Sequence, residues 1–383
     1  MPPVGAAAPR PETADPAALP EVGVQVLAGG RASRESWNRR RPLFQTVPLA
    51  CLAGGAAMVL LSAAIYLGSD RLRNFDPALI GYATATVFLA FGVTYRFVLW
   101  VANPPARRYF LQGWKASLRL RTLARSPTLV PRTLASTLFI QSFIRRRGVE
   151  RWLAHQAMFW GVLLAAGVTF PLTFGWIHFR AIPGTQHDYG LYLLGVRALT
   201  FDAFNWLGWL FFHTLDIAAV LVIAGSAYFL LHRVRERRVL ADQRFLRDLL
   251  PLLALLAVAL TGLLLTFSTT VLGGRYYHFL ALVHMSTVVL TLLFIPFGKF
   301  FHVIHRTATI GVPVYQATSQ AGSGAFECRR CGAPLEAVAF VEDLQKTMGE
   351  LRLGYPAWIE SCPRCKRLER GAAYRSLVKA RFQ

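Results

Sequence analysis

Six long apolar runs constrain this chain more than any other feature of its sequence. Each is near the roughly twenty residues that a helix needs to cross the hydrocarbon core of a bilayer. Of the 383 residues, 54% are hydrophobic and only 16% are charged, whereas about a quarter of a soluble domain is charged. Because backbone groups inside a bilayer must be satisfied internally, the runs predict an all-α membrane protein, a six-transmembrane-helix bundle. The expected spans are residues 43–67, 79–102, 152–177, 205–231, 249–270 and 278–304.

The net charge of +22 is concentrated in every other connection between these spans. The basic segments are 31–41, 104–151, 232–247 and the C-terminal tail, and the segments short of basic residues are 68–78, 178–204 and 271–277. The positive-inside rule therefore predicts a multi-pass protein of the cytoplasmic membrane with both termini cytoplasmic. The charge then reflects topology and contact with anionic membrane lipids, and no nucleic-acid partner is expected. No basic stretch precedes a short apolar core at the N-terminus, so no cleavable signal peptide is expected.

Composition divides the rest of the chain. We expect a disordered N-terminal tail with a basic end, a membrane domain, a linker, a cytoplasmic metal-binding ribbon and a basic tail, at residues 1–42, 43–304, 305–327, 328–368 and 369–383. The segment 104–151 interleaves basic residues with Leu, Phe and Trp114. That pattern predicts either amphipathic helices on the membrane surface or a docking surface for a cytoplasmic partner.

Two histidines in the last run are separated by eighteen residues. At about 100° per residue, one continuous helix would place His284 and His302 on the same face, roughly 27 Å apart. An ionisable residue inside a membrane helix is a functional candidate by default. Two on one face, near opposite membrane surfaces, suggest axial ligands of two stacked haems. The alternative is a pair of polar residues bonded to neighbouring helices.

The predicted topology gives each histidine a depth. His155, at the start of the third span, and His302, at the end of the sixth, both lie near the cytoplasmic surface and form an inner pair. His213 and His284 lie at similar distances from the outer ends of their spans and form an outer pair. Asp216 shares a helix face with His213. It could orient that imidazole, accept a proton at a quinol site, or pair with Arg197 in an outer connection.

Four of the five cysteines form two Cys-x-x-Cys pairs, Cys328 with Cys331 and Cys362 with Cys365. Two such pairs supply four thiolates in the tetrahedral arrangement that suits zinc or a single iron. The Cys-x-x-Cys-Gly and Cys-Pro-x-Cys ends resemble rubredoxin knuckles, which bind iron, whereas the surrounding basic residues are typical of a structural zinc ribbon. Cys51, in the first span, is expected to be a packing residue.

The sixth span and the residues after it resemble the gamma subunit of respiratory nitrate reductase, a membrane cytochrome b, and related subunits of heterodisulfide-reductase-type complexes. The shared residues are His284, Pro296-Phe297, Lys299, His302 and the neighbourhood of Pro313-Val314-Tyr315. The resemblance covers about residues 79–317, where spans two to six match that family's five helices. It implies haem b, a quinone and a cytoplasmic iron–sulfur or reductase partner.

That family carries two further haem ligands ten residues apart on the helix that corresponds to span three. His155 matches the first, but Ala165 stands at the second and cannot bind iron. The resemblance therefore implies an intact inner haem held by His155 and His302. At the outer site, either the haem is absent or His213 replaces the missing ligand beside His284.

The sequence predicts an electron-transfer subunit between the quinone pool and a cytoplasmic iron–sulfur or reductase partner. No residue is assigned a catalytic role, because no phosphate-binding glycine loop, nucleophile elbow or HExxH motif occurs. The alternative from another class is a transporter or proton-relay protein with a zinc-ribbon docking domain. A third reading is a membrane scaffold whose ribbon recruits a partner.

Overall fold

A computed structural model describes residues 41–236, 244–351, 353 and 356–378 of the chain. The chain divides into two units, residues 1–44 and 45–383, and apart from the first four residues of one helix, the helices and sites below belong to the second unit. Almost all of the predicted N-terminal tail lies outside the described residues.

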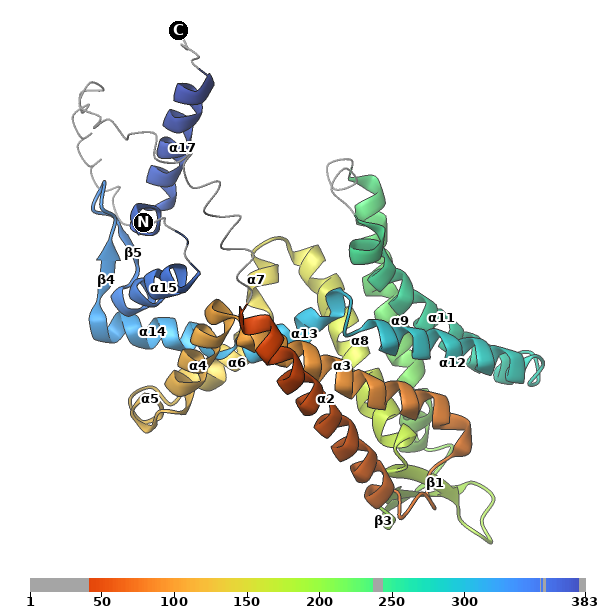
Figure 1. Cartoon of the computed structure of the whole chain (residues 1–383). Helices are drawn as coiled ribbons and strands as arrows, with labels where there is room; N and C mark the ends of the chain where they lie inside the picture. The colour runs from red at the N-terminus through yellow and green to blue at the C-terminus, as the bar shows by residue number, and fades with distance from the viewer. Residues whose placement is uncertain (1–40, 237–243, 352, 354–355, 379–383) are drawn as a thin grey trace, which may run out of the picture. The chain divides into compact units, whose positions relative to one another are not determined.

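Within the described residues, six helices are long and apolar enough to cross a membrane, which confirms the predicted number (Figure 1). The chain is therefore built as a multi-pass membrane protein. Helix α8 packs against α9, α9 against α11, α11 against α12, and α12 against α3. The six helices are α2 (Arg41–Gly68), α3 (Ile80–Ala102), α8 (Val149–Thr173), α9 (Trp206–Arg235), α11 (Leu250–Thr270) and α12 (Tyr277–Phe294). Short helical turns, η1 (Pro77–Leu79) and η3 (Phe245–Leu249), precede α3 and α11.

The contact between helices α8 and α9 depends on two glycines. A Cβ atom at Gly161 would lie 2.8 Å from the carbonyl oxygen of Ala218, and one at Gly225 would lie 2.5 Å from that of Ala154. Small residues of this kind let the backbones of membrane helices approach closely. Gly161 thus serves helix packing.

The sixth span differs from its prediction because the helix is not continuous. Helix α12 ends at Phe294, a 3₁₀ turn η4 covers Lys299–Phe301, and a new helix α13 covers His302–Ala308. Pro296 has no backbone N–H to continue the helical ladder. The expectation that His284 and His302 share one helix face five turns apart is therefore wrong.

The connection between α8 and α9, predicted as a loop, contains a three-stranded antiparallel sheet. Its strands are β1 (Ile177–Ala181), β2 (Asp188–Leu193) and β3 (Val196–Asp202), in the order β1-β2-β3. Leu194 and Gly195 both have positive φ between paired Leu193 and Val196, as a two-residue type I′ hairpin requires. The ring of buried Phe201 contacts Phe211 at 5.1 Å, which packs the sheet on the first turns of α9.

The connection between α3 and α8 is mostly helical. It contains α4 (Pro104–Leu118), α5 (Leu120–Arg125), α6 (Leu129–Leu134), the π-helical turn η2 (Ala135–Phe139) and α7 (Ser142–Arg145). Helix α4 packs against α14 (Gly311–Ser323), where Gly113 and Gly311 meet backbone to backbone. The segment 305–327 is therefore not a plain linker, because α13 and α14 occupy most of it.

The cysteine-rich end of the chain combines a short hairpin with helices. The hairpin consists of β4 (Ala325–Glu327) and β5 (Pro334–Ala337), and it is followed by α15 (Val338–Glu350), α16 (Pro356–Ile359) and α17 (Pro363–Val378). Helix α15 contacts both α14 and α4. The predicted basic tail begins inside α17, so its described part is helical.

Candidate functional site

The predicted inner histidines lie within electrostatic range of each other. His155, on the first turns of α8, is close enough to His302 and Arg306 for their charges to act on it. Its ring makes an edge contact with Phe229 of α9 at 6.3 Å. Its Nδ1 atom is buried and has no hydrogen-bond partner among the residues that the structure describes. A buried imidazole nitrogen without a partner costs free energy, which makes His155 a candidate ligand.

The ring of His302 is oriented through its Nδ1 atom. As the first residue of α13, it has Nδ1 2.7 Å from the carbonyl oxygen of Lys299, to which an Nδ1–H donates. That bond selects the tautomer with a free Nε2, the arrangement found in metal-bound histidines. The Lys299 ammonium is in turn 2.8 Å from the Asp248 carboxylate at the start of the α11 segment. Lys299 thus links two elements: its carbonyl group accepts from His302, and its ammonium group pairs with Asp248 in the turn η3 before α11.

The break between α12 and α13 is docked on α3. The Arg96 guanidinium donates to the carbonyl oxygens of Pro296 and Gly298, and stacks on the Phe301 ring 4.4 Å away. One turn earlier on α3, a Cβ at Gly92 would lie 2.7 Å from the fully buried Pro296. A helix break exposes carbonyl groups that lack the usual partner, and Arg96 satisfies them. Together these contacts place the turn that leads into His302.

His284 belongs to a separate polar cluster between α11, α12 and α3. Its Nδ1 is 2.9 Å from the Thr261 hydroxyl, which is 3.2 Å from the Thr287 hydroxyl. The Tyr82 ring is 6.5 Å from the imidazole. Because Thr261 can donate its own proton to the Ala257 carbonyl at 2.7 Å, its oxygen can accept Nδ1–H and leave Nε2 free.

His213 and Asp216 have other partners. The His213 ring stacks on Trp209 of its own helix at 4.8 Å, with Nδ1 2.9 Å from that residue's carbonyl oxygen. The Asp216 carboxylate accepts a 2.7 Å hydrogen bond from Thr266 of α11. Among the described residues, no ion pair joins Asp216 to Arg197, and no hydrogen bond or ring contact joins His213 to the other outer histidine. Within the described residues, no contact therefore supports the predicted outer pair of His213 and His284.

The four paired cysteines converge on one point. Their Sγ atoms all lie within 4.8 Å of one another, and those of Cys331 and Cys362 are 3.7 Å apart. Tetrahedral thiolates around zinc are about 3.8 Å apart, given Zn–S bonds near 2.3 Å. Three of the sulfurs are buried, and that of Cys331 is exposed. The group could bind a metal such as zinc or iron.

Local turns bring each sulfur to the cluster. Gly332, at φ +67°, closes the first knuckle, and its N–H donates to the Cys328 carbonyl at 2.9 Å. The backbone N–H of Cys362 donates to the Cys328 sulfur at 3.2 Å and lowers the pKa of that thiol to about 6. Burial raises the pKa of Cys365 to about 12. Hydrogen bonding and burial thus act in opposite directions on two thiols of the same cluster.

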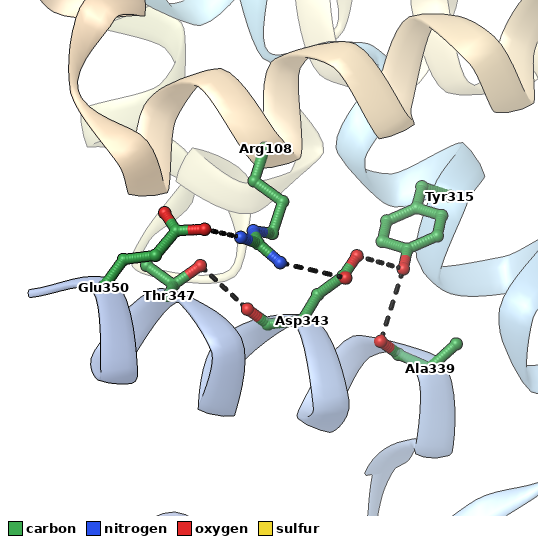
Figure 2. Close-up of polar contacts among 6 residues, drawn as sticks. All are labelled: Arg108, Tyr315, Ala339, Asp343, Thr347 and Glu350. Carbon is green, nitrogen blue, oxygen red and sulfur yellow. Dashed lines mark hydrogen bonds and ion pairs between the residues drawn. The ribbon is translucent and has the colours of Figure 1, made fainter.

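A polar network docks the cysteine-rich region on α4. Figure 2 shows the Arg108 guanidinium between Asp343 and Glu350 of α15, while the Tyr315 hydroxyl donates to Asp343 at 2.7 Å. Desolvation, and next the bond to Asp343, raise the pKa of Tyr315. Desolvation and the Asp343 charge also raise the pKa of neighbouring Tyr109 to about 12. The α15 segment is therefore attached to α4 by an almost buried charge pair and to α14 by the Tyr315 hydrogen bond.

The sequence interpretation missed Arg96 and the pair of Arg108 with Asp343. An arginine inside an apolar run is a signal that could have indicated Arg96, because such residues face the protein interior or a polar partner. Arg108 and Asp343 are far apart in the chain, and no local pattern connects them.

Comparison with known proteins produced no match: no family model fits the chain, and no curated protein or solved structure is similar to it.

Proposed function

We propose that this chain is a membrane cytochrome b-like subunit that transfers electrons between the quinone pool and an iron–sulfur or reductase partner. The observation that carries the proposal is the inner pair. His155 has a buried ring nitrogen that finds no partner in the described part of the chain, and His302, within its electrostatic range, has its Nε2 left free by the bond to Lys299. Two such imidazoles on different helices suit axial ligation of one haem.

His155 and His302 would hold haem b, which supplies reversible one-electron chemistry when bound. Other residues of the protein hold the turn before His302 in place. Arg96 caps the carbonyl groups of the α12–α13 break, and the Lys299–Asp248 ion pair connects the same turn to α11. His284, hydrogen-bonded to Thr261, remains a candidate for a quinone headgroup or a second haem.

The cysteine cluster would lie on the same membrane side as the inner pair. The alternation of basic connections puts that side in the cytoplasm, where reduced thiols favour metal binding over disulfides. We favour zinc, with a structural or docking role, because exposed arginines flank the knuckles. Iron would instead make the cluster a candidate electron relay to the partner.

An absorption spectrum of the purified protein tests the proposal. We expect the Soret and visible bands of low-spin haem b, and their loss in His155→Ala and in His302→Ala, because each variant removes an axial ligand. His187→Ala, which changes a histidine in the β1–β2 connection, should keep the bands. One haem per chain fits the inner pair alone, whereas two would require His213 and His284 to bind the second.

A protein without haem would contradict this proposal. The alternative function would then be a transporter or proton relay, which two hydrogen bonds inside the membrane favour: the one between Thr261 and His284, and the one that Thr266 donates to Asp216. Proton uptake by proteoliposomes would test that function directly.

A further inference from the structure

We propose that the outer face of α4 is a binding surface for anionic phospholipid, with the helix lying at the headgroup level of the membrane. This inference does not depend on haem or quinone. It concerns a helix that begins at Pro104, with Asn103 as the one residue between it and the end of span α3. A helix joined so closely to a span starts at the membrane surface.

One face of α4 is covered by α14, and most of the opposite face is exposed. Gly113, Ala116 and Ser117 are buried, and Gly113 meets Gly311 of α14 backbone to backbone. The other side carries Arg107, Leu111, Trp114 and Leu118 at spacings of four, three and four residues, which places them on one helix face. All four are exposed, although the Trp114 indole N–H also donates to the Ala308 carbonyl oxygen at 3.2 Å.

The exposed side chains on this face combine apolar groups with cations. Leu118 is 69% exposed and Leu111 44% exposed, an arrangement unfavourable in water. Lys115 and Arg119 are exposed along the flank of the same stripe. Apolar side chains edged by Lys and Arg are the pattern of a helix that lies in the membrane interface.

The positive charge of the sequence around α4 indicates that this surface binds an anionic ligand. No aspartate or glutamate occurs anywhere from residue 77 to residue 149. A shallow hollow of about 220 Å³ is lined by Arg107 and Lys115, by Arg108, which is already paired with Asp343 and Glu350, and by Pro104, Leu111 and Gln112. In the described part of the chain, neither Arg107 nor Lys115 forms an ion pair. A phosphodiester headgroup would pair with these cations while its acyl chains contact the leucines.

An acidic soluble partner would satisfy the cations, but it would have to cover a face that begins at the end of a membrane span. The lipid surface is already present there. The structure thus favours the first of the two readings that the sequence left open for the segment 104–151.

The experiment uses the full-length protein in nanodiscs of phosphatidylcholine with and without phosphatidylglycerol. Native mass spectrometry after release would count retained phosphatidylglycerol. Each cation near the surface contributes about fivefold in affinity. We therefore expect the Arg107→Gln/Lys115→Gln/Arg119→Gln variant to bind phosphatidylglycerol roughly a hundredfold more weakly.

Two matched variants separate this surface from general charge. Arg329→Gln/Arg330→Gln/Arg367→Gln removes the same charge near the cysteines and should retain lipid as wild type does. Arg107→Lys/Arg119→Lys keeps the charge and should also retain it. Equal loss in the control and the α4 variant, or no preference of the wild type for phosphatidylglycerol, would overturn the proposal.

The apolar stripe has its own test. In phosphatidylglycerol nanodiscs, Leu111→Gln/Leu118→Gln should speed tryptic cleavage after Lys115 and Arg119, because the helix is less deeply seated. Cleavage at the wild-type rate would count against an interfacial helix, as would protection of the wild type that appears only when a soluble partner is added.

Discussion

Replacing Cys362 by serine is expected to abolish metal binding and to unfold the hairpin and knuckles around it. The Cys362 sulfur lies 3.7 Å from that of Cys331, and its backbone N–H donates to the Cys328 sulfur. Among the described residues, Ala333 and Leu335 are the partly buried hydrophobic residues that pack against the three buried cysteines of this cluster. Metal binding therefore supplies most of the local stability, and structural zinc contributes on the order of 10–16 kcal/mol in such sites.

The measurement is metal content by elemental analysis, together with protease resistance of residues 325–378 in the full-length protein. Wild type should carry one metal per chain, colourless if zinc and red if iron. Cys51→Ser, which changes the cysteine in α2, is the matched control and should keep the metal. A Cys362→Ser protein with full metal content, or chelation that leaves protease resistance unchanged, would refute the assignment.

Replacing Arg108 by methionine is expected to release α15 from α4. The Asp343 side chain is only 10% exposed and the Arg108 side chain 20% exposed, so little water can replace the lost partner. Removing one member of such a pair leaves a buried charge and costs about 3 kcal/mol or more. Because Tyr315 still donates to Asp343 in this variant, we expect the loss of stability to be close to about 3 kcal/mol and not much larger. A loss of that size means that α15 separates from α4 roughly a hundredfold more often.

Hydrogen exchange of the α15 amides measures this opening. The control is Glu342→Gln, which removes a charge from the exposed face of α15 and does not affect Arg108. It should leave the exchange rate unchanged. The double variant Arg108→Met/Asp343→Asn should recover part of the loss, because no unpaired charge remains buried. Equal exchange in wild type and Arg108→Met would mean that the ion pair does not hold the helix.

Hydropathy located the six spans because a membrane helix is specified locally, by the length and apolarity of one segment. The predicted end of the sixth span was wrong, although the sequence contains the helix-breaking residues Pro296 and Gly298. The apolar run continues across the break, and hydropathy does not register a missing N–H. The hairpin turn at Leu194-Gly195 was missed for a similar reason, because its short strands lie in a segment that hydropathy treats only as a connection.

The sequence by itself determined the six apolar helices and the four-cysteine cluster. Both depend on short-range patterns: runs of about twenty apolar residues, and two Cys-x-x-Cys turns that each place two thiols within reach of one atom. Only the tertiary structure decided which side chains meet across the chain. Arg96 on the α12–α13 break, Arg108 with Asp343, and His155 within range of His302 all join segments distant in sequence. Such contacts depend on how the helices pack, and no spacing along the chain encodes them.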